Sequence, residues 1–332
     1  MRIIVDAFGG DNAPLEIIKG AALAAQTGVQ VLLTGKRQEI EMAAATEGIE
    51  LNGITIVDAP DIIGMQDEPR SILKEHKNSS MAQGLRCLAA GDGDAFVSAG
   101  STGAMVIGAT FYVKRIRGIS RAALAPLMPS DKGPFMLIDA GANVESRPEM
   151  LLQFAHMGSL YMTNVMGNGK PATVGLVNVG TEDTKGGELQ KEAFALLKQS
   201  GLNFIGNIEA RDIPAGIADV VVADGFTGNV ILKLTEGVAS TLMKNIKDIF
   251  YTNAITKAAA LMVKPHLKEF KKKMDASEYG GAPLLGIKKP VIKAHGNADA
   301  QTIKNAIRVA AEFAKKDVVS QIADAVKPLD NQ

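Results

Sequence analysis

The chain is short of several residue types, and each shortage excludes a class of protein. It has one cysteine and no tryptophan among 332 residues. A single cysteine cannot form an intramolecular disulfide or a cysteine-rich zinc site, so we expect Cys87 to be a small core residue. Lysine plus arginine and aspartate plus glutamate each number 36, which gives zero formal net charge. This balance argues against a general nucleic-acid-binding protein, which normally carries a basic excess.

Long hydrophobic runs are also scarce, and one uncharged stretch has to be weighed as a membrane span. Residues 95–113 carry no charge. Their middle reads Ser98-Ala99-Gly100-Ser101-Thr102-Gly103, and these small residues favour a buried strand, a loop and a helix over a lone span. The amino terminus reaches Asp6 too early for a signal peptide. We therefore expect a cytoplasmic protein.

The rest of the composition fits a folded protein larger than one ordinary core. Hydrophobic residues make up 46% of the chain and charged residues 22%, as in soluble folded proteins. A single core stops growing near ~250–300 residues, so we expect one large sheet or two joined domains. Short apolar runs alternate with segments of helical period. This pattern predicts an α/β fold with three α/β/α layers around a large mixed, mostly parallel sheet.

The expected elements follow from these periodicities. The expected strands are Arg2–Asp6, Gln30–Leu33, Ile54–Val57, Ala95–Ser98, Phe135–Asp139, Thr173–Asn178, Asn203–Gly206 and Val220–Ala223. The expected helices are Leu15–Gln26, Glu39–Glu47, Ser80–Ala90, Thr102–Val113, Glu149–Val165, Glu188–Gln199, Asn229–Tyr251 and Ala254–Met274. Two hairpins are expected, Ala122–Met128 with Phe135–Asp139 and Leu284–Ile287 with Val291–Ala294.

Two long helical patterns occupy residues 229–274, and Pro265 is expected to interrupt the second. No clear linker separates domains. We therefore expect residues 1–332 to form one intertwined α/β unit with a projecting helical pair at 229–274. Such a pair serves for dimer contact, membrane contact or both.

Four apolar strands end in a loop of small residues followed by a helix. Glycines let backbone amides approach a ligand, and the start of a helix favours an anion. Loops at the carboxyl ends of parallel strands share one edge of the sheet. The four loops therefore predict one composite site for an anion or polar ligand, although any α/β protein needs such turns. They are Asp6–Asp11, Ser98–Ala104, Asp139–Asn143 and Asp224–Asn229.

Other candidate groups are less distinctive. Lys185 lies between a strand and a helix, where it could neutralise phosphate or remain solvated, and His295 ends a strand. The other histidines lie in helical patterns and are expected at the surface or in packing: His76, His156 and His266. A divalent metal on the carboxylates of the four loops is an alternative without supporting ligand spacing. The dinucleotide, Walker and nucleophile-elbow motifs are missing.

Taken in order, these motifs resemble the PlsX-type phosphate acyltransferases over nearly the whole chain. The resemblance is carried by Val5–Pro14, Ser98–Ala104, Asp139–Asn143, Val177–Glu182, Gly206–Arg211, Asp224–Asn229, Tyr279–Gly281 and Ala294–Gly296. Ser101 stands where the family usually has asparagine.

The resemblance implies that an acyl group passes from acyl carrier protein to inorganic phosphate, without a cofactor or metal. It also implies a fold like isopropylmalate dehydrogenase and phosphotransacetylase, a homodimer, and peripheral contact with the inner face of the cell membrane. The acyl phosphate would supply a glycerol-3-phosphate acyltransferase in phospholipid synthesis.

The chemistry of that reaction suggests roles for named residues. Lys185 and backbone amides would clamp phosphate, and Asn143, Asn229 and His295 would donate to the thioester carbonyl. The predicted phosphate-binding residues are Gly9, Gly10, Asp11, Ser98, Ser101, Thr102, Gly103, Asp224 and Gly228. The predicted membrane contacts are Ile255, Leu261, Met262 and Val263, flanked by Lys264, Lys268 and Lys271–Lys273.

Several alternatives stay open from the sequence. The arm could be a dimer-packing helix pair with a solvated lysine face. A cluster of basic residues could dock an acidic carrier protein or simply be a solvated helix end: Lys114, Arg115, Arg117 and Arg121. Rival functions are acetyl transfer from coenzyme A to phosphate, a metal- and nicotinamide-dependent dehydrogenase, and a membrane-docking scaffold.

Overall fold

The computed structural model describes residues 1–167, 169–274 and 279–326. Within these ranges the strands form two sheets rather than one. A seven-stranded sheet has the order β3-β2-β1-β4-β12-β11-β5, and a five-stranded sheet has the order β6-β7-β10-β8-β9. The strands are β1 (Arg2–Asp6), β2 (Gln30–Gly35), β3 (Ile54–Asp58), β4 (Ala95–Ser98), β5 (Ala123–Leu124), β6 (Leu127–Met128), β7 (Phe135–Ile138), β8 (Val174–Asn178), β9 (Phe204–Glu209), β10 (Val220–Val222), β11 (Ala282–Leu285) and β12 (Val291–Lys293).

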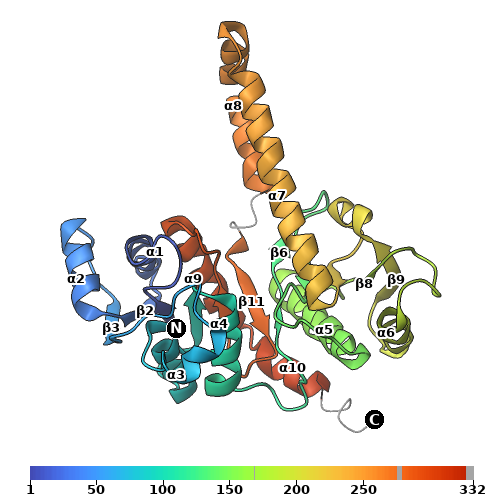
Figure 1. The fold of residues 1–332 in the computed structure, drawn as a ribbon, viewed down its shortest axis with the longest axis horizontal. Coiled ribbons are helices and arrows are strands. Elements are labelled where there is room, and N and C mark those ends of the chain that lie inside the picture. The colour runs from blue at the N-terminus through green and yellow to red at the C-terminus, as the bar shows by residue number, and fades with distance from the viewer. Residues whose placement is uncertain (168, 275–278, 327–332) are drawn as a thin grey trace.

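Helices cover both sheets (Figure 1). They are α1 (Leu15–Ala25), α2 (Arg37–Thr46), α3 (Ser80–Ala90), α4 (Thr102–Gly108), α5 (Pro148–Tyr161), α6 (Glu188–Gln199), α7 (Gly225–Phe250), α8 (Ala254–Met274), α9 (Ala300–Lys315) and α10 (Val318–Val326). Short π-helical turns extend α4 to Val113 and α5 to Met166. Residues 95–113 are thus the expected strand, loop and helix. The described part of the chain has no helix long and apolar enough to cross a bilayer.

Both sheets are mixed and mostly parallel, as the sequence predicts. In the first, β3, β2, β1, β4 and β12 run parallel, and β11 is antiparallel to β12. In the second, β7, β10, β8 and β9 run parallel, and β6 is antiparallel to β7. The expected hairpins form in part: β6 pairs with β7 and β11 with β12, whereas Ala123–Leu124 pairs with β11 in the other sheet. The β structure divides where the chain passes from the two-residue strand β5 to the two-residue strand β6.

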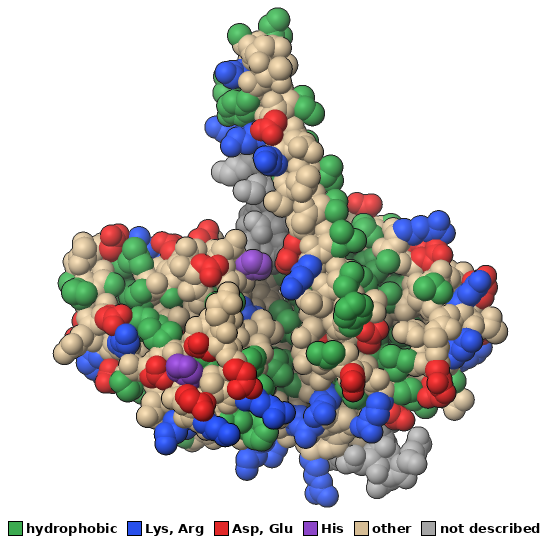
Figure 2. All heavy atoms as spheres, viewed as in Figure 1, with side chains coloured by type: hydrophobic (Ala, Val, Ile, Leu, Met, Phe, Trp, Pro, Cys, Tyr) green, Lys and Arg blue, Asp and Glu red, His purple; other side chains and the backbone are tan. Residues whose placement is uncertain are grey.

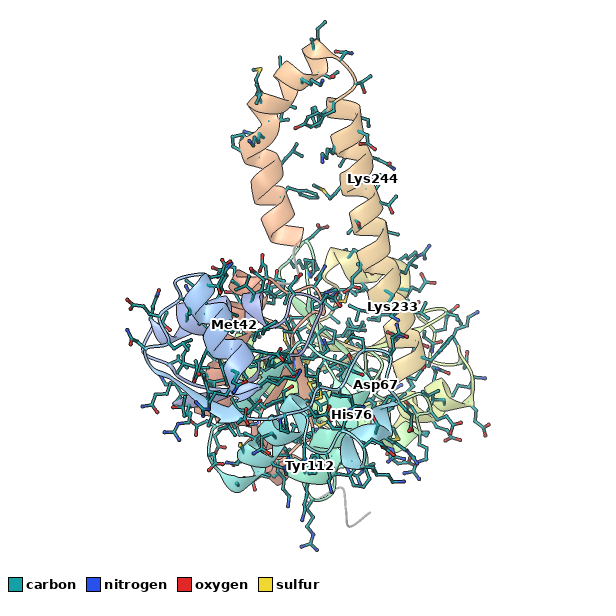
Figure 3. All side chains as sticks on the ribbon, turned by 60° about the vertical axis from the view of Figure 1, so that its left-hand side comes forward. Met42, Asp67, His76, Tyr112, Lys233 and Lys244 are labelled. Atoms are coloured by element: carbon teal, nitrogen blue, oxygen red, sulfur yellow. The ribbon has the colours of Figure 1, made fainter. Side chains whose placement is uncertain are left out.

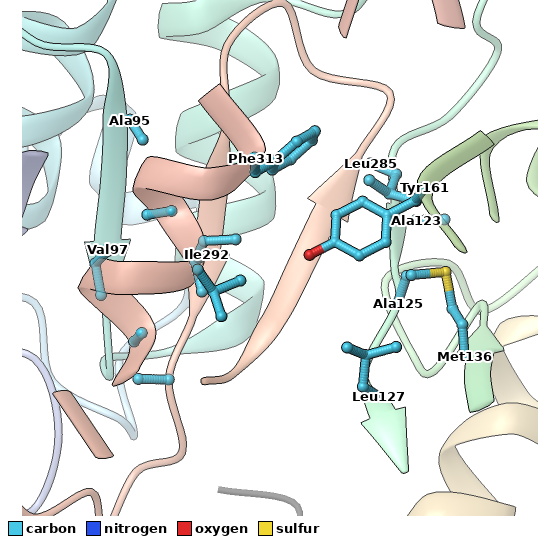
Figure 4. Packing of buried hydrophobic residues seen from close by; sticks show 14 of the residues in the cluster. Ala95, Val97, Ala123, Ala125, Leu127, Met136, Tyr161, Leu285, Ile292 and Phe313 are labelled. Carbon is cyan, nitrogen blue, oxygen red and sulfur yellow. The ribbon is translucent and has the colours of Figure 1, made fainter. Parts of the chain in front are cut away.

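Alternating side chains of the central strand β1 fill two layers of core. Ile3 and Val5 pack on one face with residues of α1 and α9, and Ile4 packs on the other with residues of α3. The first core continues into the second sheet. Tyr161 at the end of α5 meets Phe313 of α9 edge-to-face, with ring centroids 5.3 Å apart (Figure 4). This contact joins the helix layers of the two halves.

Helices α7 and α8 form an antiparallel arm that projects from the body (Figure 1). The expectation that Pro265 interrupts the second helix is wrong, because α8 runs through it from Ala254 to Met274. A proline removes one amide donor, and the neighbouring turns of α8 still continue the helix. The side chains of Lys268 and Lys271–Lys273 lie outside those that the structure describes.

Candidate active site

Three loops meet at the carboxyl edge of the first sheet, and we call them the first loop cluster (residues 6–11, 98–103 and 293–296). A Cβ on Gly9 would lie 2.6 Å from the Gly100 amide nitrogen, and one on Gly10 would lie 2.7 Å from the Gly296 carbonyl oxygen. Gly10 also has a φ of +100°, which disfavours a side chain. The Asp11 amide donates to Gly296 O at 2.7 Å. The predicted phosphate residues Gly9 and Gly10 therefore lie against the Ser98 loop, and Asp11 lies against Gly296.

Hydrogen bonds of Asp6 and Ser98 stabilise the first loop cluster. Ser98 Oγ donates to Asp6 Oδ2 at 2.7 Å and accepts from the Gly100 amide at 3.0 Å. The Phe8 amide donates to Asp6 Oδ1 at 3.2 Å. Asp6 is buried, and burial raises its pKa while its hydrogen bonds oppose the rise. Ser98 Oγ therefore stabilises the conformation of the loop through both of its hydrogen bonds.

The third loop contains a residue that sequence reasoning missed. Lys293 is the last residue of β12, and its side chain is 9% exposed. Its Nζ donates to Ala99 O at 3.1 Å and also to Ala294 O. Burial lowers the pKa of Lys293 to about 8, against the attraction of Asp11 and Asp6. The available signal was a single lysine in the otherwise apolar run Val291–Ala294.

The other two glycine loops meet at the carboxyl edge of the second sheet, and we call them the second loop cluster (residues 139–143 and 224–229). A Cβ on Gly225 would lie 1.9 Å from Asn143 O, and one on Gly228 would lie 1.9 Å from Asp139 O. Gly141 has a φ of +117°, and its missing Cβ would approach the side chain of Asn229 at 3.2 Å. Glycine is required here because two backbones touch.

Asp139 organises the second cluster through hydrogen bonds. It is fully buried and accepts from the amides of Leu124 (2.9 Å), Ala142 (3.0 Å) and Asn143 (2.8 Å). Asn143 Nδ2 donates to it at 2.9 Å and to Ala122 O at 2.8 Å. Burial raises the pKa of Asp139, and these donors oppose the rise. The role of Asn143 as a carbonyl donor stays a prediction, and its Nδ2 already has two acceptors.

Helix caps fix two more of the predicted residues. Asp224 accepts from the Thr227 amide at 2.9 Å and from Thr227 Oγ1 at 2.7 Å, so it is the N-cap of α7. Ser101 caps α4 more weakly, with Oγ 3.5 Å from the Ala104 amide. Thr102 and Gly103 follow in the first turn of α4, where a Cβ on Gly103 would meet Pro69 at 2.8 Å.

The two clusters adjoin across the junction of the sheets. The Asp139 loop bonds to Leu124 of β5, the edge strand of the first sheet. His295 Nε2 in the first cluster lies 3.9 Å from Glu236 Oε1 on α7, which begins in the second cluster. Figure 2 shows the surface hollowed between the two halves, below the arm. We call this hollow the crevice, and the approach of His295 to Glu236 links the first cluster to the helix that begins in the second.

Lys185 lies on the same side as the second cluster but is less constrained. It follows β8, which pairs with β10 through Leu176 and Val222. Its side chain is 49% exposed, and its Nζ lies 3.9 Å from Glu182 Oε1. The structure gives Lys185 no contact with a described residue of either cluster, so its part in a phosphate clamp stays a prediction.

The remaining candidate groups do not join the crevice. His156 is largely buried, and burial lowers its pKa. The sequence predicts a helix at His76, but the structure has a turn there. His76 bonds Asp61 at 2.9 Å and faces Asp67 at 3.5 Å (Figure 3). Cys87 is buried, as predicted, and burial raises its pKa. Among the described residues no cluster of three histidine, cysteine, aspartate or glutamate side chains could hold a metal ion.

Comparison with known proteins finds relatives that match nearly the whole chain. A family model described as fatty acid synthesis protein matches residues 1–321. A phosphate acyltransferase of Clostridium acetobutylicum is 45% identical over 332 residues, covering 99% of this chain and 100% of the relative. A phosphate acyltransferase of Alkaliphilus oremlandii is 46% identical over 330 residues, covering 99% of this chain and 98% of the relative.

Solved structures confirm the predicted fold class. A phosphotransacetylase from Streptococcus pyogenes has a TM-score of 0.64 at 18% identity, covering 95% of this chain and 94% of that one. EutD phosphotransacetylase from Staphylococcus aureus has a TM-score of 0.62 at 18% identity, covering 94% of each chain. These structures establish likeness of fold, while the relatives of higher identity establish the activity class. The chain belongs to the fatty acid synthesis protein family and is an enzyme, a phosphate acyltransferase.

Proposed function

We propose that this enzyme transfers a fatty acyl group from the thioester of an acyl carrier protein to inorganic phosphate. A phosphate oxygen attacks the thioester carbonyl carbon, the C–O bond forms, and the C–S bond breaks to leave acyl phosphate and the carrier thiol. The observation that carries the proposal is the pair of glycine-loop clusters at the carboxyl edges of the two sheets, with His295 of the first 3.9 Å from Glu236 of α7, the helix that begins in the second. Such loops present backbone amides to an anion.

The proposed chemistry needs little from ionisable side chains. Phosphate is partly dianionic at neutral pH and is already nucleophilic, and a thiolate is a good leaving group. The protein then has to hold the two reactants in line and stabilise the oxyanion that develops on the carbonyl. We assign the phosphate to amides of residues 98–104 and 224–229 together with Lys185. Asn229 and His295 are the proposed carbonyl donors, with Asn143 positioned behind them.

The Lys185 assignment has a direct test. Replacing Lys185 with alanine should raise the KM for phosphate by about 10- to 100-fold, since a charged hydrogen bond contributes about 1.5–3 kcal/mol. Phosphate-dependent release of the carrier thiol measures this effect. Lys191→Ala, an exposed lysine on α6, is the control and should behave as wild type. Normal phosphate saturation and normal turnover in Lys185→Ala would remove this residue from the clamp.

We propose that the acidic carrier docks on the basic patch after α4. Lys114, Arg117 and Arg121 are exposed, whereas Arg115 is half-buried and donates to Ile119 O and Ser120 O. Three exposed cations would attract an acidic partner at long range. The patch follows the far end of the helix that begins at the Ser98 loop, and the Lys288 amide donates to Lys114 O there. The docked carrier would therefore lie at the amino end of β12 and reach the loops with its extended acyl-bearing arm.

We assign the sides of the arm to a second copy of the chain. Apolar residues recur every four positions along α7 and are exposed in this single chain: Phe226, Val230, Leu234, Val238 and Leu242. Neighbours at this spacing touch, so they make a continuous apolar stripe that winds slowly around the helix. A homodimer would cover such a stripe.

The end of the arm is proposed to contact the inner face of the cell membrane. Ile255, Leu261 and Met262 are 82%, 72% and 81% exposed, and Val263 is half-buried. Lys257 and Lys264 are exposed beside them. Apolar side chains flanked by cations suit the surface of an anionic bilayer. There the acyl phosphate would reach a glycerol-3-phosphate acyltransferase of phospholipid synthesis.

The membrane assignment predicts a loss of vesicle binding. A double variant, Leu261→Glu with Met262→Glu, should abolish co-sedimentation with anionic phospholipid vesicles and keep phosphate-dependent turnover on a soluble carrier substrate. Met42→Glu is the matched control, since Met42 is 67% exposed on α2, away from the arm (Figure 3). Equal co-sedimentation of the double variant and the control would contradict the assignment.

A further inference from the structure

Lys293 is a buried cation that the proposed mechanism does not use. It ends β12 directly opposite Ser98 of β4, and its side chain is 9% exposed. Its ammonium group donates to the carbonyl oxygens of Ala99 and Ala294. Lysine is rarely buried unless a partner or a function retains it. Lys293 is therefore buried against the backbone of the first loop cluster, where a functional role would explain its retention.

The Ala99 peptide, which Lys293 holds, supports two loops at once. On one side, the next amide, that of Gly100, donates to Ser98 Oγ, which in turn bonds Asp6. On the other side, Gly10 packs against Ala99. A Cβ added to Gly10 would lie 2.9 Å from Ala99 Cβ and 3.5 Å from Ala99 O. A shift of Ala99 would therefore move the Ser98 loop and the Gly9–Asp11 loop together.

The charge of Lys293 has identifiable partners. Asp6 at the end of β1 and Asp11 in the following loop both attract it. The two strands that neighbour β12 in the sheet, β4 and β11, contain no ionisable residue. The ionisable residues of α9 lie around a separate hollow beside Met1: Lys304, Arg308, Glu312 and Lys315. Lys293 therefore supplies positive charge behind the glycine loops, with two carboxylates as its charged neighbours.

We infer that Lys293 is a positioning residue for phosphate, fixing the Ala99 peptide between two glycine loops and keeping positive charge beneath them. The inference rests on the proposed phosphate site. Its effect passes through the loops, so phosphate binding should suffer while binding of the carrier substrate does not.

The same residue links phosphate binding to pH. The pKa of Lys293 is lowered from 10.5 to about 8 by burial, so the ammonium loses its proton in the folded protein as pH rises through about 8. Phosphate, already dianionic there, should then bind more weakly. Stability should respond in the opposite direction. The unfolded chain binds more protons than the folded one between about pH 8 and 10.5, so this group makes unfolding harder as pH rises through that window.

The test is a calorimetric titration with inorganic phosphate, run beside turnover. Lys293→Met should weaken phosphate binding by about 10- to 100-fold at pH 7 and leave the KM for the carrier substrate unchanged. Lys293→Arg, which stays charged, should retain binding at pH 7 and lose the decline above pH 8. Lys315→Met, an exposed lysine of α9, should match wild type.

Several results would overturn the inference. One is wild-type phosphate affinity in Lys293→Met; another is equal weakening of both substrates in proportion to the unfolded fraction. If Lys293→Met does not fold, the phosphate affinity of the wild-type enzyme is measured against pH instead. An affinity that does not change between pH 7 and pH 9.5 would also overturn the inference. A failure of the proposed function gives a different result: the wild-type protein binds phosphate but releases no carrier thiol.

Discussion

Gly228→Ala should reduce phosphate-dependent turnover by at least about 100-fold and destabilise the fold by about 1–3 kcal/mol. The new Cβ would lie 1.9 Å from Asp139 O and 2.9 Å from Asp139 C. Both are backbone atoms at the head of the second loop cluster, so no side chain can rotate away. The start of α7 or the Asp139 loop must move instead. A displacement of about 1 Å at a reacting centre typically costs about 100-fold in rate.

Gly237→Ala is the matched control for this experiment. Gly237 lies in the same helix, and nothing approaches within 4 Å of its missing Cβ. Alanine favours a helix over glycine by about 1 kcal/mol, so this variant should be at least as stable as wild type and fully active. Thermal unfolding and thiol release measure both variants. Full turnover in Gly228→Ala would mean that the contact between the two loops is unimportant for the reaction.

Withholding phosphate should stop the reaction altogether. In the proposed mechanism phosphate is the nucleophile, and no side chain of the crevice replaces it. Two candidate nucleophiles or bases are already engaged: Ser98 Oγ bonds Asp6, and Asp139 accepts four N–H groups. Thioester cleavage should therefore rise from background with phosphate concentration and saturate. Cleavage at an undiminished rate in phosphate-free buffer would identify a hydrolase.

Local pattern was enough to predict most of the elements and the loops between them. The expected strands Arg2–Asp6 and Ala95–Ser98 and the expected helices Ser80–Ala90 and Glu188–Gln199 have the observed bounds. Helix α9 was missed, although Ile303, Ala306, Ile307, Ala310 and Phe313 recur at helical spacing and are all buried. Its amphipathic period was readable, so this omission had no physical cause.

Sheet membership could not be predicted, because it depends on pairing between distant residues. Strand β12 enters the first sheet beside β4, nearly two hundred residues earlier in the chain. The division into two sheets depends on β5 and β6, two strands of two residues each, too short to have a period. Periodicity reports which face of a segment is buried and says nothing about which strand lies next to it.

The candidate site was predicted in outline and missed in its interior. Glycines 9, 10, 225 and 228 mark close backbone contacts, which only a residue without Cβ allows. Lys293 and the four-donor environment of Asp139 depend on atoms far away in sequence. A buried lysine looks like any surface lysine until the carbonyls around it are placed.

The central claim, that the crevice joins phosphate to an acyl group, is tested most directly by following heavy oxygen. Phosphate fully labelled with 18O and a palmitoyl carrier protein are supplied to the wild-type enzyme, and the products are identified by mass spectrometry. The account predicts palmitoyl phosphate that keeps every labelled oxygen, including the one bonded to the carbonyl carbon. Unlabelled free palmitate, formed equally with and without phosphate, would contradict it.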